Sequence, residues 1–111
     1  MSELNDKLYI CILDEFPDHM TPTLASHATL WHHLKFQDDE RYQNWLENSF
    51  RKCVVRVNRK EFDKIRQLDN VGEAYELHTL GGEVSCLTIV SNNKEHKVLQ
   101  FAKLWKPLEN N

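Results

Sequence analysis

The chain has 111 residues, of which 41% are hydrophobic and 28% are charged, a balance typical of one soluble globular domain. No apolar run approaches the roughly 18 residues that a membrane-spanning helix needs, and residues 1–6 lack the basic and apolar segments of a signal peptide. We therefore expect a cytoplasmic protein with a single domain over residues 1–111 and no membrane partner. The net charge of −3 argues against nonspecific binding of nucleic acid by the whole surface.

Apolar runs alternate with segments of helical periodicity in the first half of the chain. The run over 8–13 is apolar at every position, which is typical of a strand covered on both faces. Thr21 before Pro22 predicts a helix start, with Thr21 as the N-cap and the helix continuing to about residue 36. A second helix is predicted to begin at the acids 38–40. Its apolar face would consist of Tyr42, Trp45, Leu46 and Phe50.

The second half repeats this alternation. The run over 53–57 predicts a second strand, and Asn58 with Glu61 predicts a capping pair for the helix that follows. Two further strands are predicted over 74–77 and 84–90, joined by a turn at the glycines 81–82. A final helix is marked by Val98, Phe101, Ala102 and Trp105. The sequence therefore predicts an α/β domain, a four-stranded mixed sheet flanked by helices on both faces, with 8–13 and 53–57 as interior parallel neighbours.

Cysteine and histidine spacings do not predict a metal centre. The three cysteines stand far apart inside apolar runs, which indicates reduced, packed side chains. The histidines of the first predicted helix, at 27, 32 and 33, include no pair at the i, i+3 or i, i+4 spacing that zinc ligands on one helix require. We expect no metal and no cofactor.

Four short segments stand out beyond their secondary structure. They are ASHA over 25–28, WLENSFRKCVVRVN over 45–58, LHTLGG over 77–82 and FAKLW over 101–105. In order and spacing, these segments resemble the type 2 peptidyl-tRNA hydrolases, over roughly residues 7–108. The resemblance implies the fold of that family and a link to tRNA.

The residues that would carry the chemistry of that family differ in this chain. In the family, a motif K-x-A-A-Q-x-x-H-A follows the first strand, and here Met20 and Leu24 occupy its lysine and glutamine positions. The family's aspartate falls on Thr79. Ester hydrolysis needs a positioned water and charge stabilisation at the developing oxyanion, which methionine and threonine cannot supply. We therefore assign no catalytic residue, although His27 is the candidate if the cleft is active.

The basic residues between positions 51 and 66 suggest a binding surface. Residues 1–50 have a charge balance of −6, whereas residues 51–111 have a balance of +3. The candidates for contact with tRNA phosphates are Arg51, Lys52, Arg56, Arg59, Lys60 and Lys64. A solvated face is the alternative interpretation of this stretch. If the partner were instead a protein with a basic surface, the interface would be the acidic set Asp14, Glu15, Asp18, Asp38, Asp39 and Glu40.

These observations favour a noncatalytic binding protein on a peptidyl-tRNA-hydrolase-like fold. Its partner would be tRNA or a tRNA-handling protein such as an aminoacyl-tRNA synthetase. A phage-encoded modifier of a host synthetase, acting in the host cytoplasm, is one class of protein that fits. Two alternatives stay open: a diverged hydrolase acting on peptidyl-tRNA or a related substrate, and a homodimeric interaction module.

Overall fold

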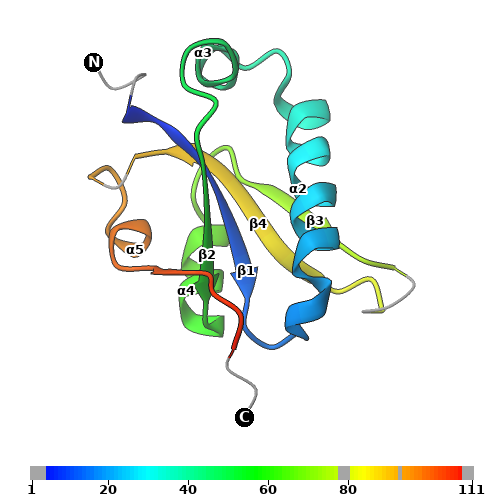
Figure 1. Cartoon of the computed structure of the whole chain (residues 1–111). Helices are drawn as coiled ribbons and strands as arrows, with labels where there is room; N and C mark the ends of the chain where they lie inside the picture. The colour runs from blue at the N-terminus through cyan, green and yellow to red at the C-terminus, as the bar shows by residue number, and fades with distance from the viewer. Residues whose placement is uncertain (1–4, 78–80, 93, 109–111) are drawn as a thin grey trace.

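One mixed sheet organises the chain, whose computed structural model describes residues 5–77, 81–92 and 94–108 (Figure 1). The strands are β1 Lys7–Leu13, β2 Lys52–Val57, β3 Gly72–Tyr75, β4 Val84–Ser91 and β5 Lys103–Leu104. The helical elements are the 3₁₀ turn η1 Asp18–Met20, then α2 Thr21–Phe36, α3 Glu40–Asn48, α4 Arg59–Arg66 and α5 Lys97–Gln100. The strands lie in the order β3-β4-β1-β2-β5. The α/β class is confirmed, but the sheet has five strands where four were predicted.

The two strands predicted to be interior neighbours pair in parallel. β1 and β2 are aligned from Leu8 opposite Lys52 to Leu13 opposite Val57. The other edge of β1 pairs with β4 in the antiparallel sense, so every β1 residue after Lys7 is buried. β3 and β4 also pair antiparallel, as the glycine turn between them predicted.

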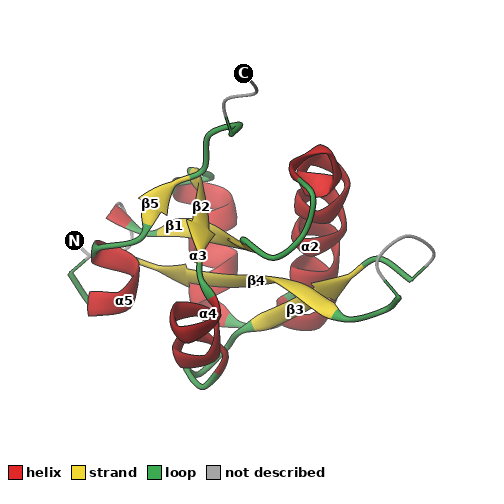
Figure 2. Ribbon diagram, turned by 90° about the horizontal axis from the view of Figure 1, so that it is seen from below, coloured by secondary structure: helices red, strands yellow, loops and turns green. Residues whose placement is uncertain are grey.

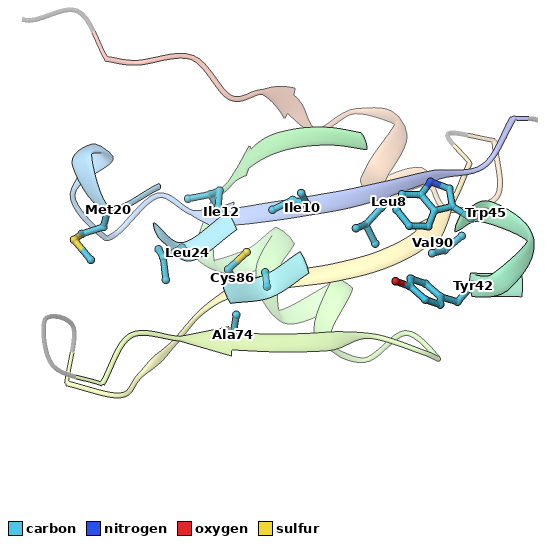
Figure 3. Packing of buried hydrophobic residues seen from close by; sticks show 11 residues of the cluster. Leu8, Ile10, Ile12, Met20, Leu24, Tyr42, Trp45, Ala74, Cys86 and Val90 are labelled. Atoms are coloured by element: carbon cyan, nitrogen blue, oxygen red, sulfur yellow. The ribbon is translucent and has the colours of Figure 1, made fainter. Parts of the chain in front are cut away.

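Helices cover both faces of the sheet, with α2 and α3 on one side and α4 and α5 on the other (Figure 1). The first core includes Leu8, Ile10, Ile12, Leu24 and Trp45 (Figure 3). The second core includes Tyr9, Cys11, Leu13, Phe62, Ile65 and Leu99. Alternate side chains of a strand point to opposite faces, which explains why β1 is apolar at every position. No helix in the described ranges is long and apolar enough to cross a membrane.

The cysteines behave as packed apolar side chains. Cys11 and Cys86 are fully buried, Cys53 is partly buried, and all three are free thiols. Burial raises the pKa of each thiol, which keeps the groups protonated and unreactive. The sequence interpretation of these residues is confirmed.

Two of the three predicted helix starts are confirmed. Asn58 and Glu61 form the reciprocal capping box of α4, and the Asp39 side chain accepts the N–H of Tyr42 at the start of α3. The predicted N-cap at Thr21 is wrong, because η1 runs directly into α2 and Thr21 already has helical angles of φ −58° and ψ −44°. Met20 is the N-cap and provides no side-chain hydrogen bond.

The end of α3 also differs from the prediction. Phe50 was placed on the apolar face of this helix, but α3 ends at Asn48 and Phe50 adopts a left-handed φ of 61°. Its N–H still donates to the carbonyl of Trp45 at 2.7 Å, and the two rings stack with centroids 5.7 Å apart. The turn reverses the chain into β2, which a continued helix could not do.

The final helix is much shorter than predicted. α5 ends at Gln100, and the chain then extends into β5, which pairs with Val55 and Arg56 of β2 (Figure 2). The N–H of Trp105 continues this pairing by donating to the carbonyl of Val54 at 2.9 Å. The strand brings the Trp105 indole against the first core, and this burial outweighs the helical spacing on which the prediction rested.

Candidate nucleic-acid interface

The six basic residues predicted to bind tRNA phosphates do not form one patch. Arg51 and Lys52 stand at the start of β2, Arg56 lies near its end, and Arg59, Lys60 and Lys64 belong to α4 or its first turn. The Lys52 ammonium lies over the Phe50 ring, 3.3 Å from its centre, beside α3. α3 and α4 cover opposite faces of the sheet, so the Lys52 ammonium is separated from the lysines of α4.

Arg56 is held in an ion pair that fastens the C-terminal segment. Its guanidinium donates to both oxygens of Asp18, at 2.8 and 3.0 Å, and to the carbonyl of Lys106. Asp18 also accepts the N–H of Leu108 at 2.9 Å. These hydrogen bonds, that from Arg56 foremost, lower the pKa of the Asp18 carboxyl. The Arg56 side chain is only 16% exposed, so its charge is already engaged within the chain.

Arg59 is exposed, but three carboxylates surround its guanidinium. It donates to Glu15 at 2.6 and 3.0 Å, and it lies 3.5 Å from Glu83 and 4.0 Å from Asp63. The same contacts engage Glu15, one of the acids predicted for the alternative protein interface. The dense basic stretch and the acidic loop before α2 therefore neutralise each other where β2 meets α4.

The lysines of α4 keep their charges free. Lys60 and Lys64, with Lys97 of α5, line a groove of about 440 Å³ whose apolar side is formed by Val98 and Phe101. In the part of the chain that the structure describes, none of the three ammonium groups has an ion pair or hydrogen bond. The Phe101 ring is 73% exposed. We call these five residues the lysine groove.

One acid, Glu61, also lines the lysine groove and leaves it with a net positive charge. The Oε1 atom of Glu61 accepts the N–H of Asn58 at 2.8 Å in the α4 capping box. The groove thus combines three free cations with one exposed aromatic ring. That combination suits a single nucleic-acid strand, because lysines attract phosphates and an aromatic face stacks on a base.

Sequence reasoning identified Lys60 and Lys64 but missed Lys97 and Phe101. Phe101 was predicted to lie within a longer final helix, whereas it lies just beyond α5 and its N–H donates to the carbonyl of Lys97 at 3.2 Å. The available signal was the spacing of four residues between Lys97 and Phe101, which places a cation beside a ring in a helical turn.

His27, the conditional catalytic candidate, lies on the opposite face of the sheet, on α2. Its Nε2 atom is 2.9 Å from the Oε2 atom of Glu76, and its ring packs beside Trp31. The His27 side chain is 40% exposed and that of Glu76 is 14% exposed. A carboxylate can orient a histidine for proton transfer, but the positions that would complete the family's site do not support this role. Met20 and Leu24 are buried in the first core, and Thr79 lies outside the described residues.

No protein-family model and no curated protein sequence matches this chain. The resemblance to peptidyl-tRNA hydrolases therefore stays a prediction, and the assignment of a site depends on the geometry described above.

Three further histidines are engaged in pairwise contacts. His32 Nδ1 is 2.8 Å from the hydroxyl of Thr88, His33 contacts the Tyr42 hydroxyl, and His96 contacts the Ser91 hydroxyl. Over residues 5–77, 81–92 and 94–108, no group of three histidine, cysteine or acidic side chains could hold a metal ion.

Proposed function

We propose that this protein is a noncatalytic binding protein that engages tRNA through the lysine groove. The observation that carries the proposal is a separation of charge: Arg56 and Arg59 are paired with carboxylates, whereas Lys60, Lys64 and Lys97 have no partner in the described ranges and lie around the exposed Phe101. Free ammonium groups gain the most from phosphate contact, because no internal ion pair must be broken first.

The binding role extends to a tRNA-handling enzyme as the second component of the complex. A small cytoplasmic protein that binds tRNA on one face and a synthetase elsewhere could change how the enzyme holds its substrate. A phage-encoded modifier of the host's valyl-tRNA synthetase is the candidate of this type. The support is the peptidyl-tRNA-hydrolase-like order of motifs together with the free lysines of the groove.

We expect no turnover because of the residues that stand at the family's catalytic positions. Met20 and Leu24 replace a lysine and a glutamine, and both side chains are buried in the first core (Figure 3). Neither can stabilise charge at an oxyanion, which is the usual source of a large share of rate enhancement in acyl transfer.

The proposal is tested by the affinity of labelled tRNA, measured by fluorescence anisotropy at low salt. Lys64→Glu should weaken binding by about tenfold, because one phosphate contact is lost and a repulsive charge is introduced. Lys35→Glu makes the same charge change on α2, across the sheet, and should leave the affinity within about twofold of the wild type. Equal weakening by both variants, or none by Lys64→Glu, would reject the lysine groove as the RNA site.

The diverged hydrolase is the second candidate, and the pairing of His27 with Glu76 favours it. A histidine held by a carboxylate could activate water if substrate entered beside Trp31. The assay is release of peptide from peptidyl-tRNA by the purified wild type and by His27→Ala. We expect no release above background from either protein. Turnover by the wild type that disappears in His27→Ala would replace the binding proposal with an enzymatic one.

A further inference from the structure

A second cavity lies at the edge of the sheet, where β4 continues beyond the first residue of β3. β3 begins at Gly72, opposite Thr88, so Ile89 and Val90 of β4 have no strand partner on that side. The gap forms a pocket of about 390 Å³ between the C-terminal end of α2, the start of α3, the loop before β3 and the segment before α5. We call it the acidic pocket. Its volume is at the lower end of the range for ligand sites, which suits a single long side chain.

His32 of α2 forms a buried wall of the acidic pocket. The residue is 2% exposed, and its ring packs against Phe36 and Tyr42 with centroids 4.5 and 5.3 Å away. Nδ1 is fixed by Thr88, whereas Nε2 has no partner in the described part of the chain. Burial lowers the pKa of His32 to about 4, so the ring is neutral at physiological pH. With the proton on Nδ1, Nε2 offers a hydrogen-bond acceptor inside the pocket.

The exposed edge of β4 adds backbone groups to the same wall. Carbonyl and N–H groups of successive strand residues point to opposite edges, so one of Ile89 and Val90 directs its pair away from β1. Beyond Thr88, no described residue forms a backbone hydrogen bond to the edge of β4 that faces away from β1. A ligand with several donors could therefore bond to a strand carbonyl as well as to His32.

The charges around the pocket favour a cation. The Arg41 guanidinium donates two hydrogen bonds to the buried Asp6 and two to Glu95. Asp39 and Asp69 also line the pocket, and no ion pair engages either carboxylate in the described ranges. The Lys35 ammonium lies nearby, over the Phe36 ring at 5.2 Å. The four acids thus exceed the two bases, and the site would repel a phosphate.

We propose that the acidic pocket receives an arginine side chain from a basic protein partner. A guanidinium is planar and carries five donors, so it can bond to Asp69, the strand carbonyl and His32 Nε2 at the same time. The inference goes beyond tRNA binding, because it assigns a protein contact to the end of the molecule where charge would exclude the RNA backbone. One of the acids predicted for a protein interface, Asp39, lines this pocket, whereas Glu15 and Asp18 are paired with arginines.

The probe for this site is N-acetyl-arginine N-methylamide, titrated against the full-length protein and followed by amide chemical shifts. We expect saturable shifts at residues 69–70 and 89–90, with an apparent Kd in the millimolar range. The citrulline analogue has the same shape without the charge and should cause no comparable shifts. Equal shifts with citrulline, or shifts at these amides with adenosine but not with arginine, would overturn the proposal.

Variants separate the pocket from the lysine groove. Asp69 is exposed, so Asp69→Asn should fold normally, and it should weaken the apparent affinity for the arginine probe at least about threefold. Glu47 is an exposed acid on α3, and Glu47→Gln should not change that affinity. Asp69→Asn should leave tRNA affinity unchanged, and Lys64→Glu should leave the arginine response unchanged. An arginine response insensitive to Asp69→Asn would contradict the site, whatever the outcome for tRNA.

Discussion

Two neighbouring basic regions of this protein carry charges of the same sign and differ in what those charges can do. Where β2 meets α4, Arg56 forms an ion pair with Asp18 and Arg59 forms one with Glu15. Both acids lie between β1 and α2. Between α4 and α5, the lysine groove holds three ammonium groups with no such partner in the described residues. The planar guanidinium fits a carboxylate with two parallel hydrogen bonds, and the lysine ammonium does not. The density of basic residues in a sequence therefore does not measure the free charge on the surface.

The contrast also assigns different roles to the two regions. The arginine region connects the loop before α2 with the C-terminal segment through Asp18, which bonds to both Arg56 and Leu108. Its contribution is to the fold. The ammonium groups of the lysine groove have no ion pair or hydrogen bond within the described residues, so their charge is available to a ligand.

The largest effect on binding that we predict from the difference between the two regions is at Phe101, the aromatic ring of the lysine groove. Phe101→Ala should weaken tRNA affinity by about tenfold, since stacking of one base on an aromatic side chain contributes about 1–3 kcal/mol. The ring is 73% exposed, so the thermal midpoint should change little. Anisotropy and thermal unfolding measured on the same preparation check both parts. Unchanged affinity would mean that the groove binds through charge alone.

Substitution in the arginine region should instead affect stability. Arg56→Met keeps much of the side chain's apolar length and should lower Tm by about 4–8 °C, as expected for a loss of roughly 1 kcal/mol in a small domain. Its tRNA affinity should match that of the wild type. A variant that is stable but weak in binding would show that Arg56 contacts the RNA.

The same ion pair predicts a direction for the pH dependence. Arg56 lowers the pKa of Asp18 in the folded protein, so the stabilisation is present above the ordinary carboxyl pKa and is lost as the pH falls through the lowered value. The Tm difference between wild type and Arg56→Met should therefore be greatest near neutral pH and shrink in strong acid. A difference that grows on acidification would rule out the carboxylate as the partner.

The smallest effect is expected at Arg59. Its pairs with Glu15 and Glu83 are exposed, and exposed pairs contribute about 0–1 kcal/mol. Arg59→Met should leave both the free energy of unfolding in urea and the tRNA affinity close to wild-type values. It is therefore the matched control for the lysine substitutions on the same helix.

The fold could be predicted wherever local signals agreed with tertiary packing. The apolar run of β1 and the Asn58–Glu61 capping box identified their elements correctly. The helical spacing of Phe101 and Trp105 misled, because β5 pairs with a strand about fifty residues earlier in the chain. No local pattern reveals that pairing. Phe50 misled for a similar reason, since the left-handed turn at this residue depends on where β2 must begin.

The candidate site could be predicted only in part. Lys60 and Lys64 followed from their spacing on one helix, and that spacing survives in the lysine groove. The pairing of Arg56 with Asp18 joins residues 38 positions apart and could not be inferred from charge density. The acidic pocket depends on β4 extending beyond Thr88, the partner of the first residue of β3, which is a property of the sheet and not of any one segment.

The salt dependence of tRNA binding tests the central claim most directly. With three lysines contacting phosphates, log K against log salt should have a slope of about −2 to −3, since each phosphate contributes roughly 0.7 to 0.9. Lys60→Glu combined with Lys64→Glu should bring the slope closer to zero by about 1.4 to 1.8, while Arg59→Met should leave it unchanged. A slope that is reduced by Arg59→Met and insensitive to the lysine substitutions would show that the arginine region, and not the lysine groove, carries the RNA.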